Sequence, residues 1–82
     1  LGNTEPPSEY LRLYPNPVGS ELWIDASFGI VSIEVFDLSG NKVMHEMGNT
    51  KSLQVSNLDA GAYIAVVSKE GGERHIAKFI KA

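Results

Sequence analysis

Residues 58–67, with the sequence LDAGAYIAVV, combine a glycine corner with an alternating apolar segment. Gly61 lacks the Cβ atom that disfavours positive φ, so the chain can turn sharply at this position. Tyr63, Ala65 and Val67 then fall on one face of an extended segment, because side chains in a strand alternate with a period of two. The segment therefore predicts a tight corner that leads directly into a buried β-strand.

The spacing of Leu58, Gly61 and Tyr63 resembles the tyrosine corner of immunoglobulin-like sandwiches. In that motif the phenol ring packs inside, and its hydroxyl group bonds the backbone a few residues upstream. Such a corner joins two sheets, and the rest of the chain supplies the other strands. We predict an all-β fold, an immunoglobulin-like β-sandwich of about seven antiparallel strands. The predicted strands are residues 10–14, 21–26, 30–38, 41–47, 51–56, 62–68 and 73–81.

Proline and glycine mark the turns between these strands. Pro15-Asn16-Pro17 ends the first strand, since proline cannot donate to a sheet and disfavours helical geometry at Asn16. Gly40 lies between two strand patterns, where a hairpin bulge requires a positive φ.

The third predicted strand, residues 30–38, has the strongest strand pattern of the seven. Val31, Ile33 and Val35 are expected to share one face, and Phe36 and Leu38 the other. We therefore expect this strand to be covered on both sides near its end.

The second predicted strand contains the only tryptophan. Leu22 and Ile24 share one face, which leaves Trp23 on the opposite face with Glu21 and Asp25. Trp23 is therefore a candidate exposed aromatic, either a platform for a sugar or a protein, or a ring lying flat over the sheet edge or under the linker. Sugar platforms usually need a second coplanar aromatic, and none is evident in the sequence.

The chain of 82 residues is long enough for one domain. Residues 1–9 (LGNTEPPSE) are polar and contain Pro6-Pro7, so we predict a linker there and a folded domain over residues 10–82. The sequence has no cysteine, so the core alone must hold the domain together. Because it begins without an initiator methionine, we expect a fragment of a longer protein. No apolar run of about 18 residues is present, so we expect no transmembrane segment.

Charge is unevenly distributed along the chain. The formal net charge of −3 argues against a nucleic-acid partner, which requires a basic face. All ten acidic residues lie at or before Glu73, and Arg74, Lys78 and Lys81 follow it. The last strand is therefore locally basic, which indicates either an ordinary solvated face or a recognition surface.

The sequence contains no motif that indicates an enzyme or a cofactor, and we expect neither. It has no phosphate-binding glycine loop before a helix and no Gly-x-Ser-x-Gly elbow. His45 and His75 could bind a metal only if the fourth and seventh strands lay side by side. Asp25, Asp37 and Asp59 could bind calcium only if loops brought them together. For Asp37 and Asp59 a turn role, in which the carboxylate bonds its own backbone, is simpler.

Five motifs follow one another in a specific order. Each is similar to a segment of one known family of domains. Residues 13–17 (LYPNP) are similar to the "YPNP" opening of that family, and residues 21–24 to its second strand. Residues 33–43 are similar to a hairpin "I-E-V-Y-D-L-x-G-K-x-V", with Asn41 where lysine is common. Residues 53–67 are similar to "L-x-V-S-x-L-x-x-G-x-Y-x-V-x-V", and residues 78–81 to a basic, apolar ending. Together these motifs resemble the C-terminal sorting domains (type A) of the bacterial type IX secretion system.

The resemblance implies a secretion signal and not an enzyme. Such a domain directs a cargo protein through the outer membrane, with cleavage in the preceding linker and attachment of the cargo to the cell surface. The implied partners are the type IX secretion machinery, a surface sortase and an upstream cargo domain. The implied localisation is the periplasm in transit, then the cell surface or the extracellular medium.

Two sets of residues are expected to matter. A basic last strand with an open edge suits recognition by strand addition or charge pairing, and its candidates are Arg74, Lys78, Phe79, Ile80 and Lys81. The family motif and structural residues are Tyr14, Pro15, Asn16, Pro17, Gly40, Leu58, Gly61 and Tyr63. The alternative function is an immunoglobulin-like accessory or carbohydrate-binding module of a secreted enzyme or adhesin, with Trp23 as its contact.

Overall fold

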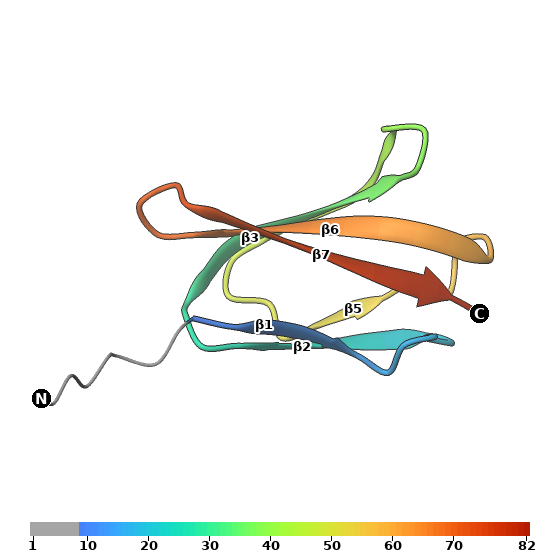
Figure 1. Ribbon diagram of the computed structural model, residues 1–82, viewed down its shortest axis with the longest axis horizontal. Helices are drawn as coiled ribbons and strands as arrows, with labels where there is room; N and C mark the ends of the chain where they lie inside the picture. The colour runs from blue at the N-terminus through green and yellow to red at the C-terminus, as the bar shows by residue number, and fades with distance from the viewer. Residues whose placement is uncertain (1–8) are drawn as a thin grey trace, which may run out of the picture.

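The computed structural model describes residues 9–82, which form seven β-strands (Figure 1). These are β1 (Leu11–Tyr14), β2 (Glu21–Ala26), β3 (Ile30–Asp37), β4 (Lys42–Met47), β5 (Ser52–Gln54), β6 (Gly61–Lys69) and β7 (Arg74–Lys81). Every predicted strand is present. The predicted linker, residues 1–9, lies outside the described residues except for Glu9. No helix that could cross a membrane occurs in residues 9–82.

The strands form two antiparallel sheets that pack as layers (Figure 1). Sheet A has the strand order β1-β2-β5, and sheet B has the order β4-β3-β6-β7. Strands β1 and β5 are therefore the edges of sheet A, and β4 and β7 are the edges of sheet B. The arrangement confirms the predicted β-sandwich.

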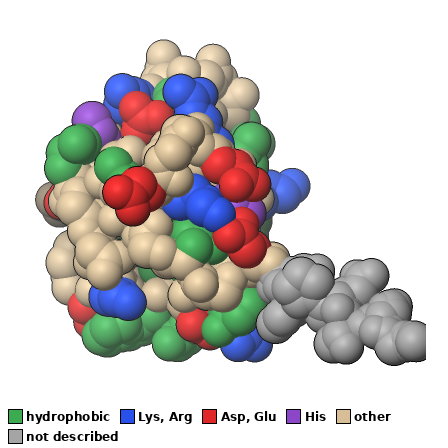
Figure 2. Space-filling model, turned by 90° about the vertical axis from the view of Figure 1, so that its left-hand side faces the viewer, with side chains coloured by type: hydrophobic (Ala, Val, Ile, Leu, Met, Phe, Trp, Pro, Cys, Tyr) green, Lys and Arg blue, Asp and Glu red, His purple; other side chains and the backbone are tan. Residues whose placement is uncertain are grey.

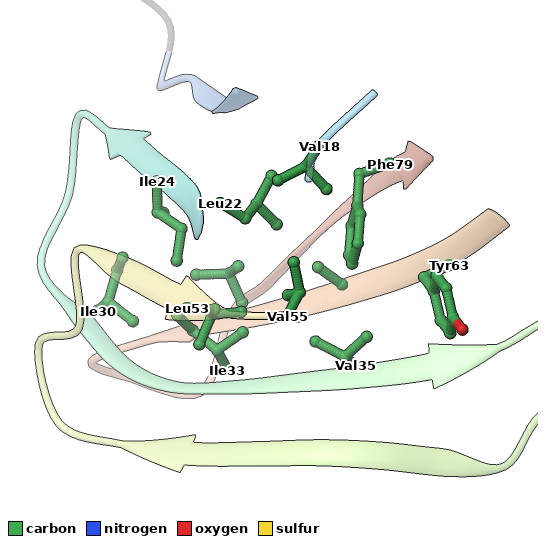
Figure 3. Packing of buried hydrophobic residues seen from close by; sticks show 12 residues of the cluster. Val18, Leu22, Ile24, Ile30, Ile33, Val35, Leu53, Val55, Tyr63 and Phe79 are labelled. Carbon is green, nitrogen blue, oxygen red and sulfur yellow. The ribbon is translucent and has the colours of Figure 1, made fainter. Parts of the chain in front are cut away.

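The core lies between the sheets and draws on both of them (Figure 3). Tyr63 and Phe79 stack with ring centroids 5.5 Å apart, and Phe79 is the largest fully buried side chain. Burial of a side chain of this size stabilises the fold by roughly 1.5–3 kcal/mol. The buried cluster consists of Val18, Leu22, Ile24, Ile30, Ile33, Val35, Leu53, Val55, Tyr63, Ala65, Val67 and Phe79.

The tyrosine corner is present as predicted. The hydroxyl group of Tyr63 donates to the backbone carbonyl of Asp59 at 2.6 Å, and Gly61 adopts a φ of 149°. Just before this corner, β5 ends at Gln54 and not at the predicted residue 56. The chain turns there because the amide of Leu58 donates to the carbonyl of Val55.

In β3 the predicted buried face is wrong at the start of the strand, and the predicted coverage of both sides is wrong at its end. Val31 is 43% exposed and does not share the buried face of Ile33 and Val35, whereas Ile30 is only 5% exposed. The pairing of β3 with β6 shifts register between Ile30 and Ser32, and a one-residue irregularity reverses which side chains face the core. At the other end, Leu38 is exposed because the strand stops at Asp37.

The hairpin between β3 and β4 bends away from the sandwich (Figure 1). Asp37 organises its turn, since its carboxylate accepts hydrogen bonds from the backbone amides of Ser39 and Asn41 and from the Asn41 side chain. These contacts confirm the predicted turn role of Asp37. Gly40 has a φ of 93°, as a hairpin bulge requires.

Candidate recognition surface

Strand β7 has one solvent-facing side and one core-facing side. Arg74, Ile76, Lys78 and Ile80 are exposed, whereas Phe79 is fully buried. His75, Ala77 and Lys81 are half-buried on the core side. Of the five predicted recognition residues, Arg74, Lys78 and Ile80 thus lie on the exposed face. The ring of Phe79 packs in the core, so a partner of the folded domain cannot reach it.

The Pro-Asn-Pro turn ends on the edge of β7. The side-chain oxygen of Asn16 accepts the amide proton of Ile80 at 2.8 Å. Val18 then forms a parallel bridge with Lys81, in which the Val18 amide donates to the Ile80 carbonyl and the Ala82 amide donates to the Val18 carbonyl, each at 2.8 Å. The chain therefore passes from sheet A to sheet B here and closes the last part of the β7 edge.

The sequence did not predict this contact. The sequence predicts only that Pro15-Asn16-Pro17 ends the strand that Tyr14 completes. The peptide bonds before Pro15 and Pro17 are cis. The one signal was Val18, an isolated apolar residue between Pro17 and a glycine, which turns out to be fully buried.

An ionic cluster of Glu9, Lys69, Glu73 and His75 fixes the start of the described chain to the β6–β7 hairpin. Lys69 forms ion pairs with Glu9 and with Glu73, the latter at 3.4 Å. The Nε2 atom of His75 lies 3.3 Å from a carboxylate oxygen of Glu9, and the His75 ring stacks on the Phe28 ring with centroids 4.4 Å apart. The hydrogen bond from Lys69 lowers the pKa of Glu9 below its usual value and raises the pKa of Lys69. Figure 2 views this end of the molecule and shows acidic side chains around basic ones.

The cluster is an ion-pair network and a poor metal site. Ligand atoms of Glu9, Glu73 and His75 lie within 4.8 Å of one another, but the Lys69 ammonium group already contacts both carboxylates. The predicted condition for a metal site of His45 and His75 is not met, because β4 and β7 are opposite edges of sheet B.

The three candidate calcium ligands also have separate roles. Asp25 pairs with Arg12 at 2.9 Å on sheet A, and Asp37 binds the turn of the β3–β4 hairpin. Asp59 supplies its backbone carbonyl to the tyrosine corner.

The exposed face of sheet A carries a second aromatic beside Trp23. Tyr14 and Trp23 are direct cross-strand partners and are 50% and 43% exposed. A hollow of about 450 Å³ on the Tyr14 side of this pair is lined by Arg12, Leu13, Tyr14 and Asp25. The sequence alone does not reveal this pair, because it depends on the register between β1 and β2.

The fold and these surfaces define a small β-sandwich module whose distinctive chemistry lies on exposed strands. The family model of secretion system C-terminal sorting domains matches residues 12–82, and the chain belongs to that family, the sorting domains of the type IX secretion system. No curated relative matches the chain. As a member of this family, the domain acts as a secretion signal, interacts with the secretion machinery and leads to secretion across the outer membrane.

Proposed function

We propose that the secretion machinery recognises the folded domain through the exposed face of β7. The observation that carries this proposal is the position of Arg74 and Lys78, which lie on either side of the exposed Ile76. Neither cation forms an ion pair with any residue from 9 to 82. Unpaired charges of one sign on a chain of opposite net charge favour an oppositely charged partner and speed its association.

A cargo fusion tests this role. In a host with a type IX system, a reporter fused to the wild-type domain is expected in the medium or on the cell surface. The double variant Arg74→Glu/Lys78→Glu is expected to leave the reporter in the periplasm, because repulsion replaces attraction. Lys51→Glu, a reversal at an exposed position near β5, is the matched control and retains secretion. Normal secretion of the double variant refutes recognition through this face.

We further propose that a surface sortase cuts the linker before the domain and that the cargo is then attached to the cell surface. The ionic cluster at Glu9 supports a cleavage position before it, because Glu9 is held by Lys69 and His75 while a protease requires an extended, accessible segment. Mass spectrometry of mature cargo is expected to find a C-terminus within residues 1–8. A cargo that always retains residues 10–82 contradicts cleavage here.

A second function, glycan binding by sheet A, is favoured by the pairing of Tyr14 with Trp23. Aromatic faces stack on sugar rings, and the neighbouring Arg12 and Asp25 can hydrogen-bond hydroxyl groups. On a glycan array, the chain is then expected to bind a sugar that Trp23→Ala and Tyr14→Ala both lose. Tyr10→Ala, which changes an exposed aromatic outside this pair, is the control. Absence of any wild-type binding rejects this second function.

A further inference from the structure

The backbone of β7 presents hydrogen-bonding groups along its outer edge. Ile80 bonds outward through both its amide and its carbonyl, to Asn16 and Val18. In an antiparallel pair, the backbone amide and carbonyl of successive residues alternate between bonding the neighbouring strand and pointing away from it. The backbone groups of Arg74, Ile76 and Lys78 therefore point outward like those of Ile80, and these three residues lie opposite Ser68, Val66 and Ile64 of β6.

This open edge has defined limits. At its C-terminal end, Asn16 and Val18 already occupy the groups of Ile80. At its N-terminal end, Lys69 and Glu73 close the β6–β7 hairpin through a backbone hydrogen bond. Within residues 9–82 no backbone hydrogen bond satisfies the outward groups of Arg74, Ile76 and Lys78. The outward backbone groups of these three residues can therefore pair with one short extended segment.

The side chains along the edge indicate what that segment carries. Arg74, Ile76 and Lys78 alternate basic, apolar and basic, and Ile76 is 70% exposed. Cross-strand neighbours on one face of a sheet stabilise pairing when their charges are opposite or their apolar surfaces meet. The complementary segment carries acidic, apolar and acidic side chains at alternate positions, and this pattern is the same in either chain direction.

We propose that β7 accepts, along residues 74–78, an extended segment of a partner protein with the pattern acidic–x–apolar–x–acidic. The inference rests on the proposed function, since it specifies how the secretion machinery engages the exposed face of β7. Main-chain hydrogen bonds supply affinity in such strand addition, and alternate side chains supply specificity.

A second copy of this chain does not fit the same edge. Antiparallel pairing of two β7 strands about Ile76 places Arg74 of one copy opposite Lys78 of the other, on both sides of the centre. Like charges directly opposite each other destabilise a strand pair. The charges therefore select against self-association while they favour an acidic partner.

Peptide titration followed by NMR tests the inference on the 82-residue chain. The probe is a synthetic peptide with the sequence Thr-Glu-Thr-Val-Thr-Glu-Thr, and a peptide with lysine in place of both glutamates is its matched control. We expect the acidic peptide to slow hydrogen exchange at the amides of Arg74, Ile76 and Lys78. The lysine peptide is expected to bind about tenfold more weakly, given the small contribution of each exposed charge pair.

Two protein variants separate backbone from side-chain recognition. Ile76→Pro removes an outward amide that takes no part in the β6–β7 ladder, and proline is tolerated at such edge positions. It is expected to abolish peptide binding with the fold retained by circular dichroism. Ile76→Thr keeps the amide and is expected to bind about threefold more weakly through the lost apolar contact.

The outcomes distinguish this inference from the proposed function. Equal binding of both peptides, or binding that Ile76→Pro leaves intact, overturns strand addition. If neither peptide binds, strand addition is also overturned. If the Arg74→Glu/Lys78→Glu variant nevertheless blocks secretion, the exposed face of β7 is still upheld as the recognition surface. Failure of the wild-type fusion to reach either the cell surface or the medium instead counts against the proposed function itself.

Discussion

The side-chain oxygen of Asn16 lies 2.8 Å from the backbone nitrogen of Ile80, 64 residues further along the chain. This contact joins the Pro-Asn-Pro turn of the family to the last strand of the domain. Beside it, Val18 continues the attachment with two backbone hydrogen bonds to Ile80 and Ala82. The turn thereby determines where the β7 edge is closed and where it remains open.

Replacement of Asn16 by alanine removes this attachment without touching the core. We expect Asn16→Ala to lower the free energy of unfolding by about 1 kcal/mol, the usual contribution of one hydrogen bond. Hydrogen exchange at the Ile80 amide is expected to accelerate, whereas exchange at Val67 in the β6–β7 ladder tracks global stability alone. Asn16→Asp, which retains an acceptor, is the control. Unchanged exchange at Ile80 in Asn16→Ala contradicts the assigned role.

Because Phe79 is part of the core, truncation of the chain before it is expected to destabilise the fold. We expect Phe79→Ala to destabilise the domain by about 3–5 kcal/mol, because it leaves a large cavity beneath Tyr63. A domain of this size has a total stability of only roughly 5 kcal/mol, so deletion of residues 78–82 is expected to unfold it. Ile76→Ser, at an exposed position on the same strand, is expected to change stability by less than about 0.5 kcal/mol.

Urea unfolding of these variants measures whether the domain is still folded, which separates a loss of fold from a loss of recognition in the secretion experiments. A truncated fusion that fails to be secreted has lost its fold as well as its recognition residues. The charge reversals at Arg74 and Lys78 avoid this problem because both side chains are exposed. A cooperative, native-like transition in the truncated chain contradicts the structural role of Phe79.

The tyrosine corner gives a third stability prediction. Tyr63→Phe removes the hydroxyl group that donates to the Asp59 carbonyl, and we expect a loss of about 1–1.5 kcal/mol in thermal or urea unfolding. Tyr14→Phe is the matched control, since Tyr14 is half exposed and its hydroxyl group has no hydrogen bond to residues 9–82. Equal effects of the two substitutions argue against a specific corner.

Local patterns in the sequence predicted most of the fold. Alternation of apolar residues located the seven strands, and the spacing of Gly61 and Tyr63 predicted a hydrogen bond that the structure confirms. These features depend on neighbours a few residues apart. By contrast, the exchange of Val31 for Ile30 on the buried face of β3 arises from an irregularity in pairing with β6, which no local pattern in β3 reveals.

The surfaces depended on contacts between distant segments and were predicted less well. The basic character of β7 was visible in the sequence, but the burial of Phe79 and the closure of the edge by Asn16 required the assembled sandwich. The partnership of Tyr14 with Trp23 likewise follows from strand register. The attachment of Glu9 to Lys69 joins residues 60 positions apart, and nothing near Glu9 in the sequence signals it.

Asp37 gives a prediction for the dependence of stability on pH. Its carboxylate accepts hydrogen bonds first from the Asn41 backbone amide and then from the Asn41 side chain and the Ser39 amide, and these contacts lower the pKa of Asp37 in the folded state. The ionised form is therefore favoured by folding. Its contribution to stability is complete above the ordinary pKa of an aspartate and is lost as the pH falls through the lowered value.

We therefore expect Asp37→Asn to be less stable than the wild type at neutral pH, by a margin that disappears in strong acid. Urea unfolding across this range measures the margin directly. Asn41→Ala, which removes only the side-chain donor, is expected to retain most of the pH dependence because the Asn41 and Ser39 backbone amides still bind the carboxylate. A margin that stays constant from neutral pH to strong acid contradicts the assigned role, since the loss then comes from packing and not from the charge of Asp37.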